Sequence, residues 1–147
     1  MLEFKIKTYQ QLTKEELYEI LRLRAEVFIV EQNCVYQDID NKDQKAIHVL
    51  GYKKNKLIAY TRIFKSGDYF KNASIGRVLV VESERNNQYG FTLMETSITL
   101  INKHFNEFII EISAQEHLEK FYNTLEFTKF GNSYLEDGIP HIKMIKS

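Results

Sequence analysis

The stretch "IGRVLVVESERNNQYGFTLMETSI", which runs from Ile75 to Ile98, changes character twice. It begins as an apolar run typical of a strand, continues as a polar loop from Arg85 to Gly90, and ends in a helical pattern. The start of a helix leaves backbone N–H groups unpaired and carries the positive end of the helix dipole. A polar loop that leads into such a start is therefore a candidate anion site.

Two side chains make phosphate the favoured anion for this loop. Arg85 supplies a planar cation suited to phosphate oxygens, and Gly90 is expected to let the backbone turn tightly. The alternative is an ordinary loop in which Arg85 pairs with Glu84 and Gly90 only relieves a turn. Rossmann and P-loop nucleotide motifs do not fit, because the loop has one glycine and Phe91-Thr92 follows it.

Upstream of this stretch, the patterns predict one strand, one helix and a hairpin. "LEFKIKTY" alternates apolar and polar residues, which is the period of a half-buried strand. Thr13 and Glu16 have the spacing of a capping box, which predicts the start of a helix. The helical pattern that follows gives way to a loop near Glu31. "AIHVLGYKKNKLIAYTRIFK" then reads as two antiparallel strands joined at residues 53–56.

Downstream, a helical stripe is followed by a buried strand, a short helix and a final hairpin. The stripe contains Met94 and Ile98, the buried strand is "FIIEIS", the short helix is "EHLEKFYNTL", and the hairpin turns at Asp137-Gly138. The resulting order is β, α, β, β, β, α, β, α, β, β. It predicts an α/β protein with a mixed sheet in one layer, helices on its faces, and a single domain over residues 1–147.

Composition excludes several classes of partner. In 147 residues, twenty Lys and Arg balance twenty Asp and Glu, so nucleic acid is not expected to bind. No apolar run approaches the roughly 18 residues of a membrane helix, and the single cysteine, Cys34, fits a reducing compartment. We expect a cytoplasmic protein. The histidines are scattered and form no H-E-x-x-H motif, so we expect no metal.

The element order, with an arginine-led loop between the fourth strand and a long helix, resembles the GNAT acyl-CoA N-acyltransferases. In their loop pattern, Q/R-x-x-G-x-G/A, Arg85 and Gly90 match the ends and Gln88 stands at the first glycine. In "EISAQEHLEKFYNTLEF", Gln115 falls at the family's Asn position and Tyr122 at its Tyr position. Glu126 replaces the usual glycine before the phenylalanine. The segments "RAEVFIVEQNCVYQDID", "IGRVLVV" and "EDGIPHIKM" further resemble the ElaA branch.

The resemblance implies an acetyl-CoA-dependent N-acetyltransferase with a mostly antiparallel sheet, one splayed parallel strand pair and helices on both faces. Its acceptor would be an amine of a small molecule or peptide, attacking directly in a ternary complex. The implied cofactor contacts are Val78, Leu79, Val80, Arg85, Asn86, Asn87, Gln88, Tyr89, Gly90, Phe91 and Gln115. The rival hypothesis is a non-catalytic acyl-CoA-binding or protein-interaction domain that keeps this fold.

Acyl transfer from a thioester needs a proton for the leaving thiolate and a polarised carbonyl. Tyr122 is the candidate general acid by its family position, although its place on an apolar face with Leu118 and Phe121 is equally that of a core aromatic. A backbone N–H of Leu79 or Val80 is expected to polarise the carbonyl.

The base and the acceptor contacts are less determined by the sequence. The chain offers the following candidates for a base: Glu31, His48, Glu111, His117 and His141. Of these, His141 and Glu31 lie in the ElaA-like segments, and water is the alternative. The loop with Tyr36, Asp38, Asp40 and Asp43 could gather a cationic amine, or be a solvated acidic loop. The expected acceptor contacts are Glu31, Tyr36, Asp38, His48 and His141. A monomer and a homodimer are both compatible with the sequence.

Overall fold

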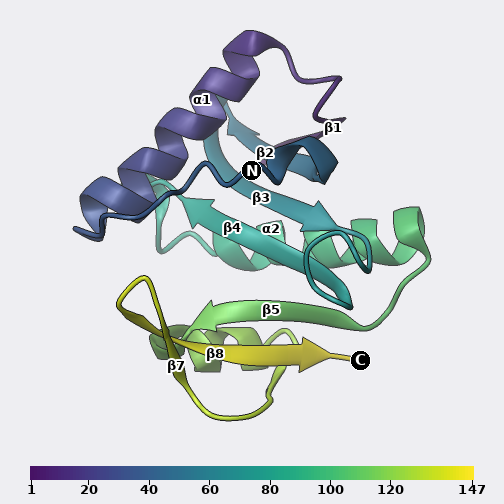
Figure 1. The fold of residues 1–147 in the computed structure, drawn as a ribbon. Coiled ribbons are helices and arrows are strands. Elements are labelled where there is room, and N and C mark those ends of the chain that lie inside the picture. Colours follow the sequence, from purple (N-terminus) through teal and green to yellow (C-terminus); the bar gives the residue numbers. More distant parts are fainter.

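The computed structural model describes residues 1–147 and contains one eight-stranded sheet with helices on both of its faces (Figure 1). The strands are β1 (Glu3–Thr8), β2 (Ile47–Lys53), β3 (Lys56–Phe64), β4 (Ala73–Val80), β5 (Ile110–Gln115), β6 (Thr128–Lys129), β7 (Tyr134–Glu136) and β8 (Ile139–Lys146). The α-helices are α1 (Lys14–Arg24), α2 (Tyr89–Leu100) and α3 (Glu119–Asn123). In Figure 1, α1 lies in front of the sheet and α2 lies behind β4.

The sheet is mixed, as expected. Its strand order is β1-β2-β3-β4-β5-β8-β6, with β7 paired to β8, and only β4 and β5 pair in parallel. The hairpin between β2 and β3 closes at the predicted residues, since Lys53 pairs with Lys56 across Lys54 and Asn55, which both have positive φ. The final hairpin turns at Asp137-Gly138, also with positive φ at both residues. The mostly antiparallel architecture is therefore confirmed, and the very short β6 is the one strand that the sequence did not indicate.

Helix α1 starts at the predicted capping box but ends differently. The Thr13 hydroxyl accepts from the Glu16 N–H at 3.1 Å, and the Thr13 N–H donates to the Glu16 carboxylate at 2.8 Å. After Arg24 the chain winds on as a π-helix from Ala25 to Glu31. The same wider winding follows α2, from Ile101 to Phe105. Neither π-segment leaves a signal in the apolar spacing, because both continue the helical stripe.

The core lies between the sheet and its helices. Met94, Ile98 and Ile101 of the predicted stripe are buried there, packed with strand residues of β3 and β4. The strand expected at "FIIEIS" begins later than predicted, because Phe108 and Ile109 are 60% and 51% exposed and pairing starts at Ile110. The sheet contacts, and not hydrophobicity alone, set where β5 begins.

The parallel pair of β4 and β5 is short. The two strands pair only at Ala73 with Ile110 and at Ser74 with Glu111. Beyond these residues each strand follows its outer neighbour, β3 on one side and β8 on the other. The sheet therefore opens between them, which is the splayed parallel pair that the resemblance implied.

A bulge in β4 contributes to this opening. Across β3, Arg62 faces Gly76 and Tyr60 faces Leu79, so β4 contains one more residue than its partner in this interval. Arg77 lies inside the bulge and has φ of 50°, an unusual value for a residue in a strand. Its guanidinium donates to the Asp38 carboxylate at 2.7 Å, and this ion pair holds the bulge from the side.

Candidate functional site

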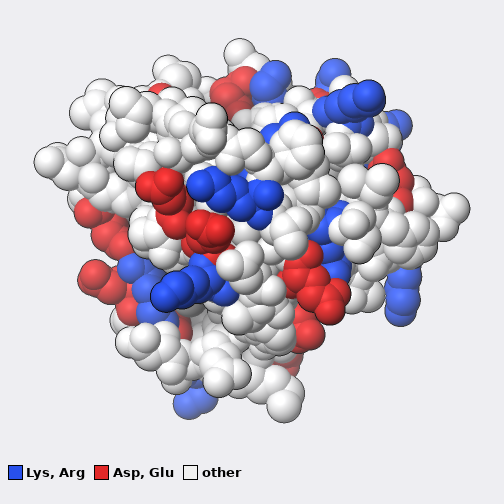
Figure 2. Space-filling model, turned by 90° about the horizontal axis from the view of Figure 1, so that it is seen from below, with Lys and Arg blue, Asp and Glu red and all other residues white.

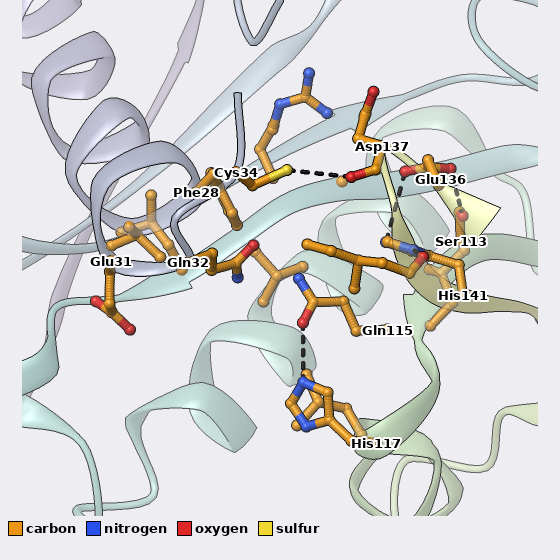
Figure 3. A pocket seen from close by; sticks show the side chains of 18 of the residues that line it. Phe28, Glu31, Gln32, Cys34, Ser113, Gln115, His117, Glu136, Asp137 and His141 are labelled. Carbon is orange, nitrogen blue, oxygen red and sulfur yellow. Dashed lines mark hydrogen bonds and ion pairs between the residues drawn. The ribbon is translucent and has the colours of Figure 1, made fainter. Parts of the chain in front are cut away.

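A cleft of about 550 Å³ occupies the opening between β4 and β5. Figure 3 shows Phe28 and Glu31 of the first π-segment, and Gln32 directly after it, on one wall of the cleft. Ser113 and His141 lie on the other wall. The loop before α2 reaches one end of the cleft, and the β7–β8 hairpin reaches the other. We call these the donor end and the acceptor end, after the acyl donor and the amine acceptor that the resemblance implies.

The donor end presents a run of unpaired backbone donors. None of the N–H groups from Asn86 to Phe91 donates to an acceptor in the protein, and α2 starts at Tyr89 within this run. The helix dipole adds partial positive charge at the same place. Successive free N–H groups at a helix start are suited to bind an anion such as a phosphate.

The backbone of this loop explains the glycine in the family pattern. Gln88, which stands at the first glycine position, is in the left-handed conformation with φ of 60°. Asn86 has φ of 71° as well. A glycine adopts such angles without steric cost, whereas a glutamine does so at a cost of about 1–2 kcal/mol.

Gly90 plays a different part from the one expected. It lies in the first turn of α2 without a positive φ, and a Cβ added there would meet Phe121 at 3.6 Å, an ordinary contact. The turn therefore does not require a glycine at this position.

Arg85 does not pair with Glu84, the protein partner considered from the sequence. Its Nε donates to the Val80 carbonyl at 2.9 Å, and its two Nη atoms donate to the carboxylate of Glu31 at 2.5 and 2.9 Å. Glu84 pairs instead with Lys53 at 2.8 Å. Arg85 is thus fixed at the donor end with a carboxylate on it, so a phosphate must compete with Glu31 for the guanidinium.

Tyr122 is a core residue that also borders the cleft. Its ring packs edge-on against Phe121 and Phe127, and the residue is 5% exposed, as for a core aromatic. The residue also lines the cleft, and its hydroxyl makes no hydrogen bond within the protein. Burial raises the pKa of Tyr122 to about 12, so the hydroxyl keeps its proton at neutral pH.

Of the two backbone donors expected to polarise a carbonyl, the strand geometry favours Val80. The Val81 N–H donates to Ile58 in β3 at 2.9 Å. Because successive residues of an antiparallel strand direct their N–H groups to opposite sides, the Leu79 N–H faces β3 and that of Val80 faces the cleft. The bond from Arg85 to the Val80 carbonyl agrees with this orientation.

The acceptor end holds a cluster of polar side chains from three strands. His141 in β8 is 7% exposed, and its Nδ1 lies 2.7 Å from the carbonyl oxygen of Ile139. The Ser113 hydroxyl of β5 donates to the Glu136 carboxylate at 2.9 Å and also bonds the Tyr134 hydroxyl. Glu136 lies 3.6 Å from His141 Nε2.

Two further candidates for the base are already engaged. His117 lines the cleft, but its Nε2 donates to the Oε1 of Gln115 at 2.9 Å. Glu111 lies outside the cleft, at the short parallel pair, where it contacts Asn72 at 3.3 Å and Lys143 at 3.8 Å. Gln115, which the resemblance implies as a cofactor contact, lines the cleft.

The expectation that His48 contacts the acceptor is wrong. His48 is fully buried away from the cleft, where its Nε2 donates to the Asp43 carbonyl at 2.9 Å and its Nδ1 accepts from the Tyr60 hydroxyl at 2.6 Å. Burial lowers the pKa of His48, which favours the neutral ring. Its position in β2, one strand too far from the opening, explains the error.

The acidic loop after α1 does not gather an amine either. Asp38 binds Arg24 at 2.9 Å and Arg77 at 2.7 Å, and both it and Arg24 are buried. Burial opposes ionisation of Asp40, but hydrogen bonds and charge from Arg62 outweigh it and lower the pKa of Asp40 to about 2. The complete ion network, in which Arg77 and Asp40 are partly exposed and the others are buried, consists of Arg24, Arg62, Arg77, Asp38, Asp40 and Asp43.

Tyr36 is the one member of this loop among the expected acceptor contacts that reaches the cleft. Its hydroxyl donates to Asp38 at 2.8 Å, and its ring lies 5.8 Å from the Arg77 guanidinium. Burial, followed by the bond to Asp38, raises the pKa of Tyr36. The loop therefore forms part of the wall and stabilises the bulge in β4.

Sequence reasoning missed the polar cluster at the acceptor end. Ser113 is a single hydroxyl at the end of an apolar run, and Glu136 and Asp137 resemble ordinary turn residues beside a glycine. The signal that could have found them is register, because Tyr134 and Gln115 both pair with His141 across neighbouring strands. Cys34, also in the wall, donates its thiol proton to the Asp137 carbonyl at 3.2 Å.

Surface charge, hydropathy and metal-ligating side chains indicate no further binding site. Lysine and arginine side chains are interspersed with aspartate and glutamate on the face shown in Figure 2, where neither sign forms a broad patch. No helix combines the length and the apolar character needed to cross a bilayer. The structure brings together no group of three or more histidine, cysteine or acidic side chains that could hold a metal ion.

Comparisons with known proteins agree with the geometry. A family model described as an acetyltransferase (GNAT) domain matches residues 8–147. The chain is 40% identical to the ElaA protein of Escherichia coli, with 99% of this chain and 97% of that protein covered, and 39% identical to a UPF0039 protein of Schizosaccharomyces pombe over 97% and 95% of the two chains.

Solved structures give the same result. The crystal structure of E. coli ElaA superposes with a TM-score of 0.93 at 40% identity, and both chains are covered completely. An acyl-CoA N-acyltransferase from Pseudomonas aeruginosa superposes with a TM-score of 0.94 at 34% identity, again over the whole of both chains.

Proposed function

Since the chain belongs to the GNAT acetyltransferase family, we propose that it transfers the acetyl group of acetyl-CoA to an amine of a small molecule or peptide. The observation that carries the proposal is the opening between β4 and β5, whose wall includes Arg85, the residue that directly precedes the free N–H groups of residues 86–91. The opening could bind an extended acyl carrier along β4, and the N–H groups could bind the phosphates of that carrier.

The donor end supports coenzyme A as the carrier. The loop N–H groups and Arg85 would hold the pyrophosphate, with the phosphate replacing Glu31 on the guanidinium. The pantetheine arm would lie along residues 78–80, where β4 has no neighbour on the cleft side. Gln115, across the opening in β5, faces this arm.

The proposed reaction is direct attack of the amine on the thioester. The Val80 N–H would stabilise the negative charge that develops on the carbonyl oxygen. Tyr122 would then give its hydroxyl proton to the leaving sulfur, because this hydroxyl is protonated, belongs to a residue of the cleft wall and has no hydrogen-bond partner in the protein. Positioned proton transfer of this kind contributes typically 10²- to 10⁴-fold to the rate.

Thiol release measured with acetyl-CoA and a panel of amines tests the proposal. The panel contains polyamines, amino acids, aminoglycosides and peptides with free N-termini, and the expected result is release above the hydrolysis blank with at least one class. A parallel thermal melt with acetyl-CoA measures binding alone. Stabilisation by acetyl-CoA without release for any amine would favour the non-catalytic acyl-CoA-binding domain, and no stabilisation would contradict both hypotheses.

A further inference from the structure

The charges that line the cleft are unevenly compensated. Arg77 is neutralised by Asp38, and Arg85 by Glu31. The two remaining charged side chains, Glu136 and Asp137, have no Lys or Arg partner, and both lie where β7 turns into β8. The acceptor end therefore carries uncompensated negative charge, whereas the donor end carries a cation and free N–H groups.

His141 adds an unpartnered nitrogen to this end. The Ile139 carbonyl can only accept a hydrogen bond, so the proton of the neutral ring is on Nδ1 and the lone pair is on Nε2. His141 Nε2 makes no hydrogen bond, although the residue is 93% buried, and Figure 3 shows the ring beside Glu136 in the cleft wall. A proton taken up on Nε2 would lie 3.6 Å from the Glu136 carboxylate.

Both side chains are held in place by their neighbours. The Ser113 hydroxyl donates to Glu136 Oε1 at 2.9 Å, which leaves Oε2 for a ligand. The Tyr134 ring stacks on the His141 imidazole with centroids 6.3 Å apart, and the Tyr134 hydroxyl bonds Ser113. Residues of β5, β7 and β8 thus fix one carboxylate oxygen and one basic nitrogen at the edge of the same cleft.

We infer that Glu136 and His141 form the acceptor subsite, which takes primary ammonium groups whose remaining part is neutral or cationic. Glu136 Oε2 binds the ammonium, and His141 Nε2 removes its proton. Acceptors with a carboxylate near the amine are disfavoured, because Glu136 and Asp137 repel it. This inference rests on the proposed acetyl transfer and names the substrate class for it.

The step is balanced without any further reagent. One proton passes from the ammonium nitrogen to His141 Nε2, and the nitrogen lone pair forms the N–C bond with the thioester carbonyl carbon. The C–S bond breaks, and the sulfur takes the hydroxyl proton of Tyr122. The nitrogen still carries two hydrogens when the N–C bond forms, and it loses one of them to solvent. The imidazolium proton returns to the tyrosinate through solvent, so the products are the N-acetyl amine, free coenzyme A and one proton.

Three acceptors of one length test the substrate class. Butylamine, 1,4-diaminobutane and 4-aminobutyrate carry the same reacting amine and differ in the charge of the far end. With saturating acetyl-CoA, we expect kcat/KM to be highest for the diamine and lowest for 4-aminobutyrate, with a span of at least about tenfold. Equal values, or a preference for 4-aminobutyrate, would overturn the substrate class.

Two variants separate binding from proton removal. Glu136→Gln keeps an acceptor for Ser113 but removes the charge, so we expect KM for the diamine to rise and the span between diamine and 4-aminobutyrate to shrink. His141→Gln removes the basic nitrogen, so we expect kcat to fall by roughly 10²-fold or more with little change in KM. His104→Asn, an exposed histidine on the π-segment after α2, is the matched control.

Acetyl-CoA affinity and the melting temperature are measured on every variant, and both should match the wild type. An unchanged kcat in His141→Gln, or an unchanged span in Glu136→Gln, would overturn the corresponding role. These results differ from failure of the proposed function, in which the wild type itself releases no thiol with any amine although acetyl-CoA binds.

Discussion

The two ends of the cleft differ in the groups that form them, which are mainly backbone N–H groups at one end and side chains at the other. The donor end consists mainly of backbone N–H groups, those of Val80 and of residues 86–91, together with Arg85. The acceptor end consists of side chains that three strands bring together, among them Ser113, Glu136 and His141. A backbone site depends on local conformation and tolerates many side chains, whereas a side-chain site changes with each substitution. The difference explains how one fold keeps its donor while its acceptor varies.

Replacing Tyr122 should produce the largest effect at the boundary between the two ends. In Tyr122→Phe the ring still packs in the core, but the proton donor is lost, so kcat should fall by about 10²- to 10⁴-fold while acetyl-CoA affinity stays the same. Stopped-flow or steady-state thiol release and calorimetry measure the two quantities. Tyr18→Phe, at an exposed tyrosine, is the control. An unchanged rate in a reaction limited by chemistry would exclude Tyr122 as the acid.

Replacing Arg85 tests whether the donor end also needs a side chain. Arg85→Ala removes charge-assisted bonds to phosphate, so the Kd of acetyl-CoA should rise by about tenfold or more. Glu31→Gln should act in the opposite direction and tighten binding by no more than about fivefold, because it removes a partly exposed competitor. Isothermal titration calorimetry measures the Kd of acetyl-CoA for both variants. A weaker affinity in Glu31→Gln would show that Glu31 positions Arg85 for the ligand.

Alkaline unfolding tests whether the Tyr122 hydroxyl is as buried as the structure indicates. The folded pKa of about 12 exceeds the unfolded value of 10.0, so the stability that this group contributes is present below pH 10 and is lost as the pH rises toward 12. Relative to Tyr122→Phe, the wild type should lose roughly 1 kcal/mol between pH 8 and pH 11. Urea unfolding at both pH values measures the difference, and a constant difference would contradict the burial.

The smallest expected effect concerns the loop backbone itself. Gln88→Gly relieves a left-handed residue but makes the unfolded chain more flexible, so stability should rise by no more than about 1 kcal/mol. Gln88→Ala keeps the strained φ and should give no increase. Denaturant midpoints of the two variants are compared directly. A loss of stability in Gln88→Gly would mean that the glutamine side chain contributes contacts in the loop.

Much of the fold follows from local patterns. The capping box at Thr13, the hairpin at residues 53–56 and the turn at Asp137-Gly138 all depend on neighbours in the sequence, and each lies where it was predicted. The polar loop that leads into the start of α2 was predictable for the same reason. The bulge at Arg77 was not, since nothing next to it in the sequence requires a positive φ.

The acceptor end and the acidic loop show why the remainder was not predictable. Whether a carboxylate is free depends on arginines that reach it from distant elements, and Asp38 meets Arg24 of α1 and Arg77 of β4. His48 and His141 look alike in the sequence, yet β2 buries the first and β8 places the second at the opening. Strand order, which short patterns do not specify, decides between them.

The extra residue in β4 also has a consequence for how the protein folds. Without it, the outer half of β4 would pair with β3 one residue out of step, and Leu79, now 2% exposed, would exchange places with Val80. The ion pair that favours the bulge comes from Asp38, 39 residues earlier in the chain. The ion pair between Asp38 and Arg77 therefore favours the correct register of β4 against β3. A chain paired in the wrong register lacks both its buried leucine and the backbone donor facing the cleft.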